Sequence, residues 1–198
     1  MAVDVHAVLR NLLEFYDFRG TTVLSVGAGG GQLAEYGRTA KRVVAVDHDP
    51  DALRALAERL AERGLADRFE LLAADVLAVE RRADVVLFEF SLHEMSDPAA
   101  ALGHAAALAP DVVVLDHAEG STWAWHVVEE DKLAVAARAI AARGTRRSLR
   151  VETVQRFATY AELTDKVGVQ GGEALRRAEP FAGRSGFEIP MAYRLDLI

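Results

Sequence analysis

A glycine-rich turn directly after a short apolar run constrains this chain more than any other feature. The run begins at Val23 and gives way to glycines at Gly27, Gly29, Gly30 and Gly31. A strand, a turn of this kind and a helix are typical of βαβ units that bind nucleotide-containing ligands. Glycine lets the backbone approach a ligand where a Cβ would collide, and a helix N-terminus expected near Gly31 would point N–H groups at that ligand. The turn alone fits nicotinamide and flavin cofactors, or a plain tight turn.

Acidic residues follow the next apolar runs. Asp47 ends the run 43–46, Asp75 follows the run 69–73, and Glu89 ends the run 83–88. Each run is predicted to be a strand. Because the carboxyl ends of parallel strands meet at one edge of a sheet, these side chains are expected to converge on one crevice. An acid after the second strand can accept both ribose hydroxyls of an adenosine.

Taken in order, these motifs resemble those of class I S-adenosylmethionine (SAM)-dependent methyltransferases. The nearest variety is the small-molecule group that contains the ubiquinone and menaquinone C-methyltransferases. The resemblance covers roughly residues 21–116. The segment Leu92–Pro98 matches that group's LHH…DP segment, with Glu94 in place of the second histidine. Leu108–Asp111 stands where the usual LRPGG is found. Both departures concern the substrate and leave the cofactor motifs intact.

The resemblance implies S-adenosyl-L-methionine as the cofactor. The glycine turn is expected to hold its methionine part, Asp47 its ribose and Asp75 the adenine side. The predicted cofactor-binding residues are Val26, Gly27, Ala28, Gly29, Gly31, Asp47, His48, Asp75, Val76, Glu89 and Phe90.

Alternating apolar runs and helical patterns predict an α/β fold. We expect a Rossmann-like, doubly wound, mostly parallel seven-stranded sheet with helices on both faces. Its last strand, over Met191–Leu197, is expected to be antiparallel as in the resembled family. The chain is predicted to be a single class I methyltransferase domain, residues 1–198. Within it, 1–20 form an N-terminal helix that packs on the sheet or covers the site as a lid, 21–155 form the SAM-binding core, and 156–198 form an irregular cap segment and the final strand.

Helical patterns also set expectations inside the core and cap. The spacing of apolar residues predicts a long helix over Thr122–Arg143, which opens with Trp123 and Trp125. Shorter helices are predicted over Thr159–Val167 and Glu173–Ala178. Two tryptophans beside a ligand mouth suit a flat or cationic substrate, or simply pack in the core.

Bulk composition excludes several classes of function. A protein that binds nucleic acid needs a basic face, so the net charge of −7 argues against a nucleic-acid partner. The arginines between 143 and 150 are expected to complement a helix end. With no cysteine there are no disulfides, thiolate metal sites or cysteine nucleophiles. No apolar run approaches the roughly 20 residues that span a bilayer, and the N-terminus lacks signal-peptide features, so we expect a cytoplasmic protein without a membrane partner. The oligomeric state is left open between a monomer and a homodimer.

Four side chains are candidates for catalysis: Glu89, His93, His117 and His126. Glu89 ends a buried strand, where it could deprotonate an amine, contact the cofactor's ammonium, or be satisfied by nearby N–H groups. His93 or His117 could serve as a general base oriented by Glu94, Glu119 or Asp116. The three histidines with a carboxylate could instead bind a divalent metal, but no compact ligand spacing supports this, so no metal ligand is assigned.

The sequence therefore predicts a SAM-dependent methyltransferase that moves a methyl group to a nitrogen, oxygen or carbon of a small molecule by in-line displacement. Three alternatives stay open: a metal-assisted small-molecule methyltransferase, a nicotinamide-dependent oxidoreductase that uses the same glycine turn, and a non-catalytic SAM-binding module.

Overall fold

The computed structural model describes residues 3–198. Within them, seven strands form one sheet: β1 (Thr22–Val26), β2 (Arg42–Asp47), β3 (Phe69–Ala73), β4 (Val85–Glu89), β5 (Asp111–His117), β6 (Arg147–Thr159) and β7 (Ser185–Leu197). The α-helices of this part of the chain are α1 (Val5–Phe15), α2 (Pro50–Glu62), α3 (Pro98–Leu108), α4 (Thr122–His126), α5 (Glu130–Arg143), α6 (Tyr160–Val167) and α7 (Gly172–Ala178). None of these helices is long and apolar enough to cross a membrane.

The strand order is β3-β2-β1-β4-β5-β7-β6. The strands β1 to β5 pair in parallel, and β7 pairs antiparallel with both β5 and β6. This confirms the predicted doubly wound, mostly parallel sheet with an antiparallel last strand. The winding reverses between β1 and β4, and ligands of open α/β sheets bind outside the carboxyl ends of the strands at such a switch point.

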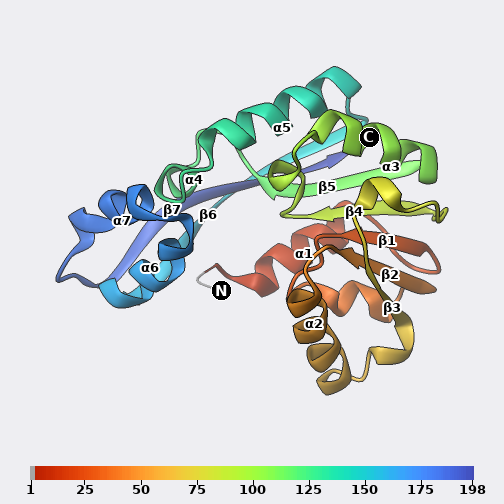
Figure 1. The fold of residues 1–198 in the computed structure, drawn as a ribbon, viewed down its shortest axis with the longest axis horizontal. Helices are drawn as coiled ribbons and strands as arrows, with labels where there is room; N and C mark the ends of the chain where they lie inside the picture. The colour runs from red at the N-terminus through yellow and green to blue at the C-terminus, as the bar shows by residue number, and fades with distance from the viewer. Residues whose placement is uncertain (1–2) are drawn as a thin grey trace.

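Alternating side chains of the central strands supply two cores, one on each face of the sheet. One face packs against α1 through Val8, Leu12 and Phe15. The other face packs against α3 and α5. Figure 1 shows α3 and α5 together on one side of the central strands and α1 and α2 on the other. Both faces are thus covered, as a parallel sheet requires.

Side chains cap the N-termini of three helices. Asp49 caps α2 by accepting a hydrogen bond from the N–H of Asp51, with Pro50 at the first helical position. Asp97 caps α3 by accepting from the N–H of Ala100. Thr159 caps α6 by accepting a hydrogen bond from the N–H of Glu162. These caps fix the starts of the helices that follow β2, β4 and β6.

Two expected helices differ from the structure. The glycine turn leads into a short 3₁₀ helix, η1 (Ala34–Arg38), and not into an α-helix. The predicted long helix over Thr122–Arg143 is two helices, α4 and α5. The helix is interrupted at Val128, whose φ of +58° is incompatible with a continuous helix and rare for a β-branched residue. This break turns Glu129 toward His93, so a local backbone distortion supplies a site residue.

The strands β6 and β7 are longer than the sequence predicted. They pair with each other from Arg147 to Thr159, whereas β5 pairs only with residues 193–197 of β7. The parts of β6 and β7 that lie beyond β5 still pair with each other. They form a two-stranded arm that carries α6 and α7, seen at the left of Figure 1. The helices expected at Thr159–Val167 and Glu173–Ala178 are present there as α6 and α7.

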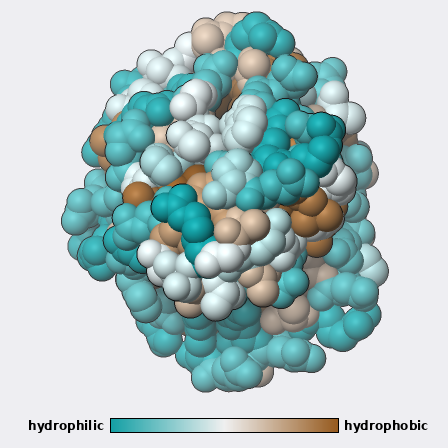
Figure 2. All heavy atoms as spheres, turned by 90° about the vertical axis from the view of Figure 1, so that its left-hand side faces the viewer, coloured by the Kyte–Doolittle hydropathy of each residue, from teal (hydrophilic) through white to brown (hydrophobic). Residues whose placement is uncertain are grey.

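Figure 2 views the molecule from the end that carries this arm. Hydrophilic residues dominate that face, and its hydrophobic residues form small separate patches. The face therefore offers no broad apolar surface in this view.

Candidate functional site

A cavity of about 470 Å³ lies at the carboxyl ends of β1, β2 and β3. We call it the acid-lined cavity because Asp47 and Asp75 both line it. Each carboxylate uses one oxygen locally: Asp47 Oδ1 accepts from the N–H of Asp49 at 3.0 Å, and Asp75 Oδ1 accepts from the N–H of Leu77 at 2.9 Å. Among residues 3–198, the Oδ2 atom of neither has a hydrogen-bond partner. Each can therefore accept a hydrogen bond from a ligand in the same hollow. Other predicted cofactor residues that line it are Val26, Gly27, His48, Val76 and Phe90.

A second cavity, of about 390 Å³, adjoins the first. We call it the tryptophan-lined cavity, after Trp123 of α4. Gly27 and Phe90 line both cavities, so the two share a wall. The remaining lining residues of the second cavity are Val3, Ala28, Gly29, Gln32, Leu33, Glu89, His117, Val127, Glu129, Gln155, Lys166, Val169, Gln170 and Met191.

The shared wall is sterically tight. Gly27 has a φ of +70°, and a Cβ on it would lie 2.2 Å from the Cβ of Ser91. Phe90 follows β4 with a φ of +52°, a conformation uncommon for a residue with a side chain. Backbone strain of this kind clusters at ligand sites. Of the predicted glycines, Gly31 lines neither cavity; its backbone packs against Leu56.

Glu89 is buried at the end of β4 and lines the tryptophan-lined cavity. Its Oε1 accepts hydrogen bonds from Ser25 Oγ at 2.5 Å and from the Tyr36 hydroxyl at 2.7 Å. Burial raises the pKa of Glu89 to about 7, although both hydrogen bonds favour the charged form. A cation that entered the cavity beside it would stabilise the carboxylate. The partners of Glu89 are therefore two hydroxyls, not the backbone N–H groups considered from the sequence.

His117 ends β5 and lines the tryptophan-lined cavity. Its ring packs against Phe90, with centroids 4.9 Å apart, and its buried Nδ1 has no hydrogen-bond partner within residues 3–198. Burial lowers the pKa of His117. The Oε1 atom of Gln155 is also buried without a partner and belongs to the same wall. Unpaired polar atoms in a cavity wall can bind a polar ligand.

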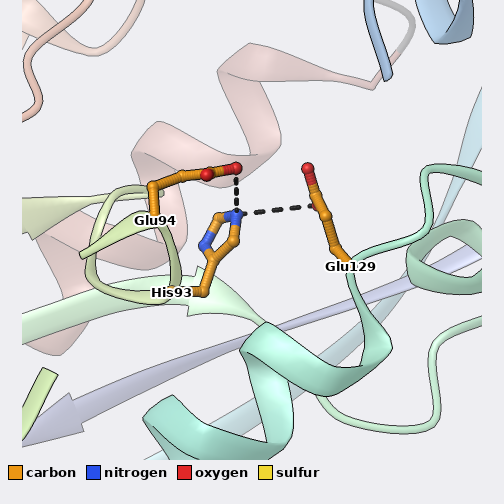
Figure 3. A group of neighbouring side chains, drawn as sticks. All are labelled: His93, Glu94 and Glu129. Atoms are coloured by element: carbon orange, nitrogen blue, oxygen red, sulfur yellow. Dashed lines mark ion pairs between the residues drawn. The ribbon is translucent and has the colours of Figure 1, made fainter. Parts of the chain in front are cut away.

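His93 is buried among three carboxylates. Its Nδ1 lies 2.5 Å from Asp116 Oδ1, and its backbone N–H donates to Asp116 Oδ2. Its Nε2 lies 3.3 Å from Glu94 Oε1 and 3.6 Å from Glu129 Oε2 (Figure 3). Burial lowers the pKa of His93, but the carboxylates of Asp116, Glu129 and Glu94 outweigh it and raise the pKa to about 11. A histidine that retains its proton at neutral pH cannot accept another, so this environment argues against His93 as a general base.

His126 lies apart from the other candidates. It lines neither cavity; its ring contacts Trp125 and Phe181, and its buried Nδ1 lacks a partner in the described part of the chain. The structure thus brings Glu89 and His117 to one cavity, places His93 behind it, and leaves His126 outside. The metal set of three histidines drawn from the sequence is not assembled among residues 3–198.

Several side chains of the tryptophan-lined cavity were not predicted. Lys166 of α6 reaches it, and burial lowers the pKa of this ammonium. Lys166 lies over the Trp123 ring, 5.6 Å from its centroid, and forms no ion pair in the described chain. Gln155 carried no signal, because its neighbours in β6 include the polar Glu152, Thr153 and Arg156. Lys166 and Gln170 carried none, because their place depends on how the arm folds back.

The strand order and the acids at the ends of β2 and β3 define the class I methyltransferase fold. A family model described as "Methyltransferase domain" matches residues 24–114. Ribosomal protein L11 methyltransferase of Sorangium cellulosum (strain So ce56) is 39% identical over 80 residues, which are 38% of this chain and 25% of that relative. The chain spans about a quarter of the length of the first curated relatives it matches.

Solved structures agree on the fold. A SAM-dependent methyltransferase from Aquifex aeolicus superposes with a TM-score of 0.59 at 18% identity, over 100% of this chain and 90% of that one. Magnesium protoporphyrin IX methyltransferase from Synechocystis PCC 6803, solved with bound SAM, gives 0.59 at 14% identity, over 97% and 77%.

The chain has the class I methyltransferase fold, and its residues 24–114 match the methyltransferase-domain model, in agreement with the resemblance drawn from its motifs. The predicted enzyme class, a methyltransferase, is that of the matched family model. The predicted cofactor, S-adenosylmethionine, is the one named for these two solved structures.

Proposed function

We propose that this chain is a SAM-dependent methyltransferase whose acceptor is a small molecule held in the tryptophan-lined cavity. The observation that carries the proposal is the shared wall at Gly27 and Phe90. It joins a hollow with two free carboxylate oxygens to a second hollow of about 390 Å³, which both apolar and polar side chains line. A ligand that reaches from the acid-lined cavity past Gly27 and Phe90 would present its reactive end to a second molecule in the tryptophan-lined cavity.

The residues present fit S-adenosylmethionine. The free oxygens of Asp47 and Asp75 suit the ribose hydroxyls and the adenine amino group. Gly27 leaves room that a Cβ would fill. Glu89, which lines the second cavity beside the glycine turn, suits the ammonium of the methionine part. When bound, this cofactor supplies a methyl group on a sulfonium, which an in-line displacement can transfer. The chain itself has to position the two reactants, which can contribute roughly 7–11 kcal/mol to lowering the barrier.

The walls of the tryptophan-lined cavity favour a flat acceptor with an anionic group. Trp123 offers an aromatic face, and the half-buried Lys166 offers an ammonium that lacks a carboxylate partner in the described chain. Gln155 Oε1 can accept a hydrogen bond from the acceptor. His117 lies at the same wall, where its ring would contact the acceptor. The reacting atom is a nitrogen, oxygen or carbon. A cytoplasmic location and a monomer or homodimer stay predictions.

Calorimetric titration of the purified chain with SAM, its demethylated product and NAD tests the cofactor. We expect saturable binding of SAM and of the demethylated product, and none of NAD. Binding of NAD without SAM would overturn the proposal in favour of an oxidoreductase.

The acceptor is tested by transfer of radiolabelled methyl from SAM to two sets of substrates. One set is small aromatic carboxylates and amines; the other is ribosomal protein L11, the substrate named for the curated relatives. We expect label in small molecules only. Label in the protein would refute the small-molecule part, and SAM binding without transfer to any acceptor would favour a non-catalytic module.

A further inference from the structure

We propose that His93, Glu94 and Glu129 form a binding site for one divalent transition-metal cation. The three side chains come from the segment after β4 and from the break between α4 and α5, and Figure 3 shows them turned toward one another. One donor atom from each lies within 4.8 Å of the other two. A metal site is a property separate from methyl transfer, and metal binding can be measured without turnover.

The spacing of the donor atoms fits a metal better than a hydrogen bond. His93 Nε2 lies 3.3 Å from Glu94 Oε1 and 3.6 Å from Glu129 Oε2. A charge-assisted N–H···O bond is shorter, at about 2.7–2.9 Å. Ligands about 2.1 Å from a tetrahedral cation lie about 3.4 Å from each other. His93 and Glu129 are 4% and 5% exposed, so the site is held by buried side chains.

The outer groups are arranged as around a metal. His93 Nδ1 lies 2.5 Å from Asp116, the arrangement in which a carboxylate orients a metal-binding imidazole. The other oxygens of the two glutamates are also held: Lys132 donates to Glu94 Oε2 at 2.6 Å, and Gln170 donates to Glu129 Oε1 at 3.0 Å. Each donor atom is thereby left facing the centre of the group.

Charge balance points the same way. Within residues 3–198, Lys132 is the one lysine or arginine that forms an ion pair with this group. A bound cation would displace the proton that His93 holds in the free chain, as metal binding to imidazole does. Three carboxylates and one ammonium then leave two negative charges, which one divalent cation balances. Imidazole with carboxylates suits Zn²⁺, Mn²⁺ or Fe²⁺. Because Glu129 lines the tryptophan-lined cavity and Glu94 the acid-lined one, the cation would lie between the two. Any action on the acceptor rests on the proposed function.

The test is titration of the full chain with Zn²⁺ and Mn²⁺ after treatment with EDTA and desalting. We expect one saturable site per chain. Glu129→Gln, Glu94→Gln and His93→Gln should each weaken binding by at least about tenfold, since loss even of an outer-shell partner costs 10–100-fold. His104→Gln is the matched control, because His104 contacts the Val79 carbonyl and lies outside the group; its affinity should equal that of the unmodified chain.

Circular dichroism of each variant shows whether it folds. Glu94 is half exposed, so Glu94→Gln keeps the test decisive if the two buried replacements unfold. Absence of a saturable site, or a folded Glu94→Gln protein that binds as tightly as the unmodified chain, would overturn the proposal. SAM titration of the unmodified chain and of His104→Gln separates this outcome from failure of the proposed function, because neither protein is altered at a residue of either cavity.

Discussion

The two cavities of this molecule are built in different ways. Residues 26–101 line the whole acid-lined cavity, which is formed by the ends of neighbouring parallel strands and the loops that follow them. The tryptophan-lined cavity takes its residues from Val3 to Met191 and needs α4, α6 and both strands of the arm. The first is therefore a property of the βαβ framework. The second depends on how distant segments fold over that framework.

This difference separates two tasks. A cavity at strand ends can hold the same cofactor part in any protein with this fold, because backbone geometry places its acids. A cavity completed by an arm and a broken helix can change its lining without changing the sheet. Apart from Glu89 and the shared wall, which would contact the cofactor's methionine part, substitutions in the two cavities should therefore affect separate measurements, cofactor affinity in one and acceptor affinity in the other.

The largest effect is expected at the wall that the cavities share. Gly27→Ala combines a left-handed backbone, which costs about 1–2 kcal/mol, with a collision at 2.2 Å that a tight core resists at about 1–3 kcal/mol. We expect a loss of unfolding free energy of about 2–5 kcal/mol and no measurable SAM binding. Gly64→Ala is the control, because Gly64 has a φ of +64° with no atom within 4 Å of its Cβ position. It should cost only about 1–2 kcal/mol and keep SAM binding. Thermal unfolding and calorimetry are the measurements. Equal losses of unfolding free energy and of SAM affinity in both variants would show that the absence of a Cβ at Gly27 has no particular role in the shared wall.

The next effect isolates the acid-lined cavity. Asp47→Asn removes a charged acceptor, and hydrogen bonds to charged groups contribute about 1.5–3 kcal/mol, so SAM should bind about 10–150-fold more weakly. Asp49→Asn is matched to it, since asparagine also caps a helix and Asp49 serves α2. That control should bind SAM like the unmodified chain. Similar Kd values for SAM in both variants would show that Asp47 does not contribute to SAM binding.

The same contrast explains what the sequence could predict. The mostly parallel sheet and the convergence of Asp47 and Asp75 follow from apolar runs and from acids directly after them. Such signals are local, because each residue's place is fixed by the strand it ends. The break at Val128 is not local, since it overrides a helical pattern for the sake of tertiary contacts.

Most of the tryptophan-lined cavity was beyond prediction for the same reason. Lys166 and Gln170 reach it only because β6 and β7 extend past β5. The histidines show the limit within the site itself. Asp116 and Glu94, which the sequence offered as partners of a histidine, do contact His93, whereas Glu129 was not among them. Pairs at neighbouring strand ends were therefore predictable, but a partner supplied by the break at Val128 was not.

A pH dependence should link the two cavities through Glu89. Its folded-state pKa of about 7 exceeds the ordinary 4.5, so the folded chain binds more protons than the unfolded chain between these values. Stability contributed by this group is present below pH 4.5 and is lost as the pH rises through 7, by about 3 kcal/mol at most.

Binding of the cofactor's ammonium favours the carboxylate, so SAM affinity should rise with pH, roughly tenfold between pH 6 and 7.5, and then level off. Glu89→Gln should bind SAM more weakly and without this slope. Calorimetry of both proteins across that range is the measurement, and a slope that persists in Glu89→Gln would assign it to another group.

A smaller effect is expected in the acceptor half alone. Lys166→Met removes the unpaired ammonium, and loss of one partly buried charged contact of about 1–1.5 kcal/mol should raise the KM for an anionic acceptor about 5–10-fold. The Kd for SAM should not change. Lys41→Met, at an exposed lysine that lines neither cavity, controls for net charge. A weaker SAM complex in Lys166→Met would show that the cavities are not energetically separate.

The smallest effect should come from His126, a predicted catalytic residue that lines neither cavity. His126→Phe keeps the ring contacts with Trp125 and Phe181 and removes a buried nitrogen that has no partner in the described chain. Since an unsatisfied buried polar atom costs about 1–3 kcal/mol, the melting temperature should stay the same or rise. The Kd for SAM and the KM for the acceptor should stay within about twofold, because no cavity-lining atom is altered. A large fall in kcat with normal binding would instead restore His126 as a catalytic residue, and would require the arm to bring it to the acceptor during turnover.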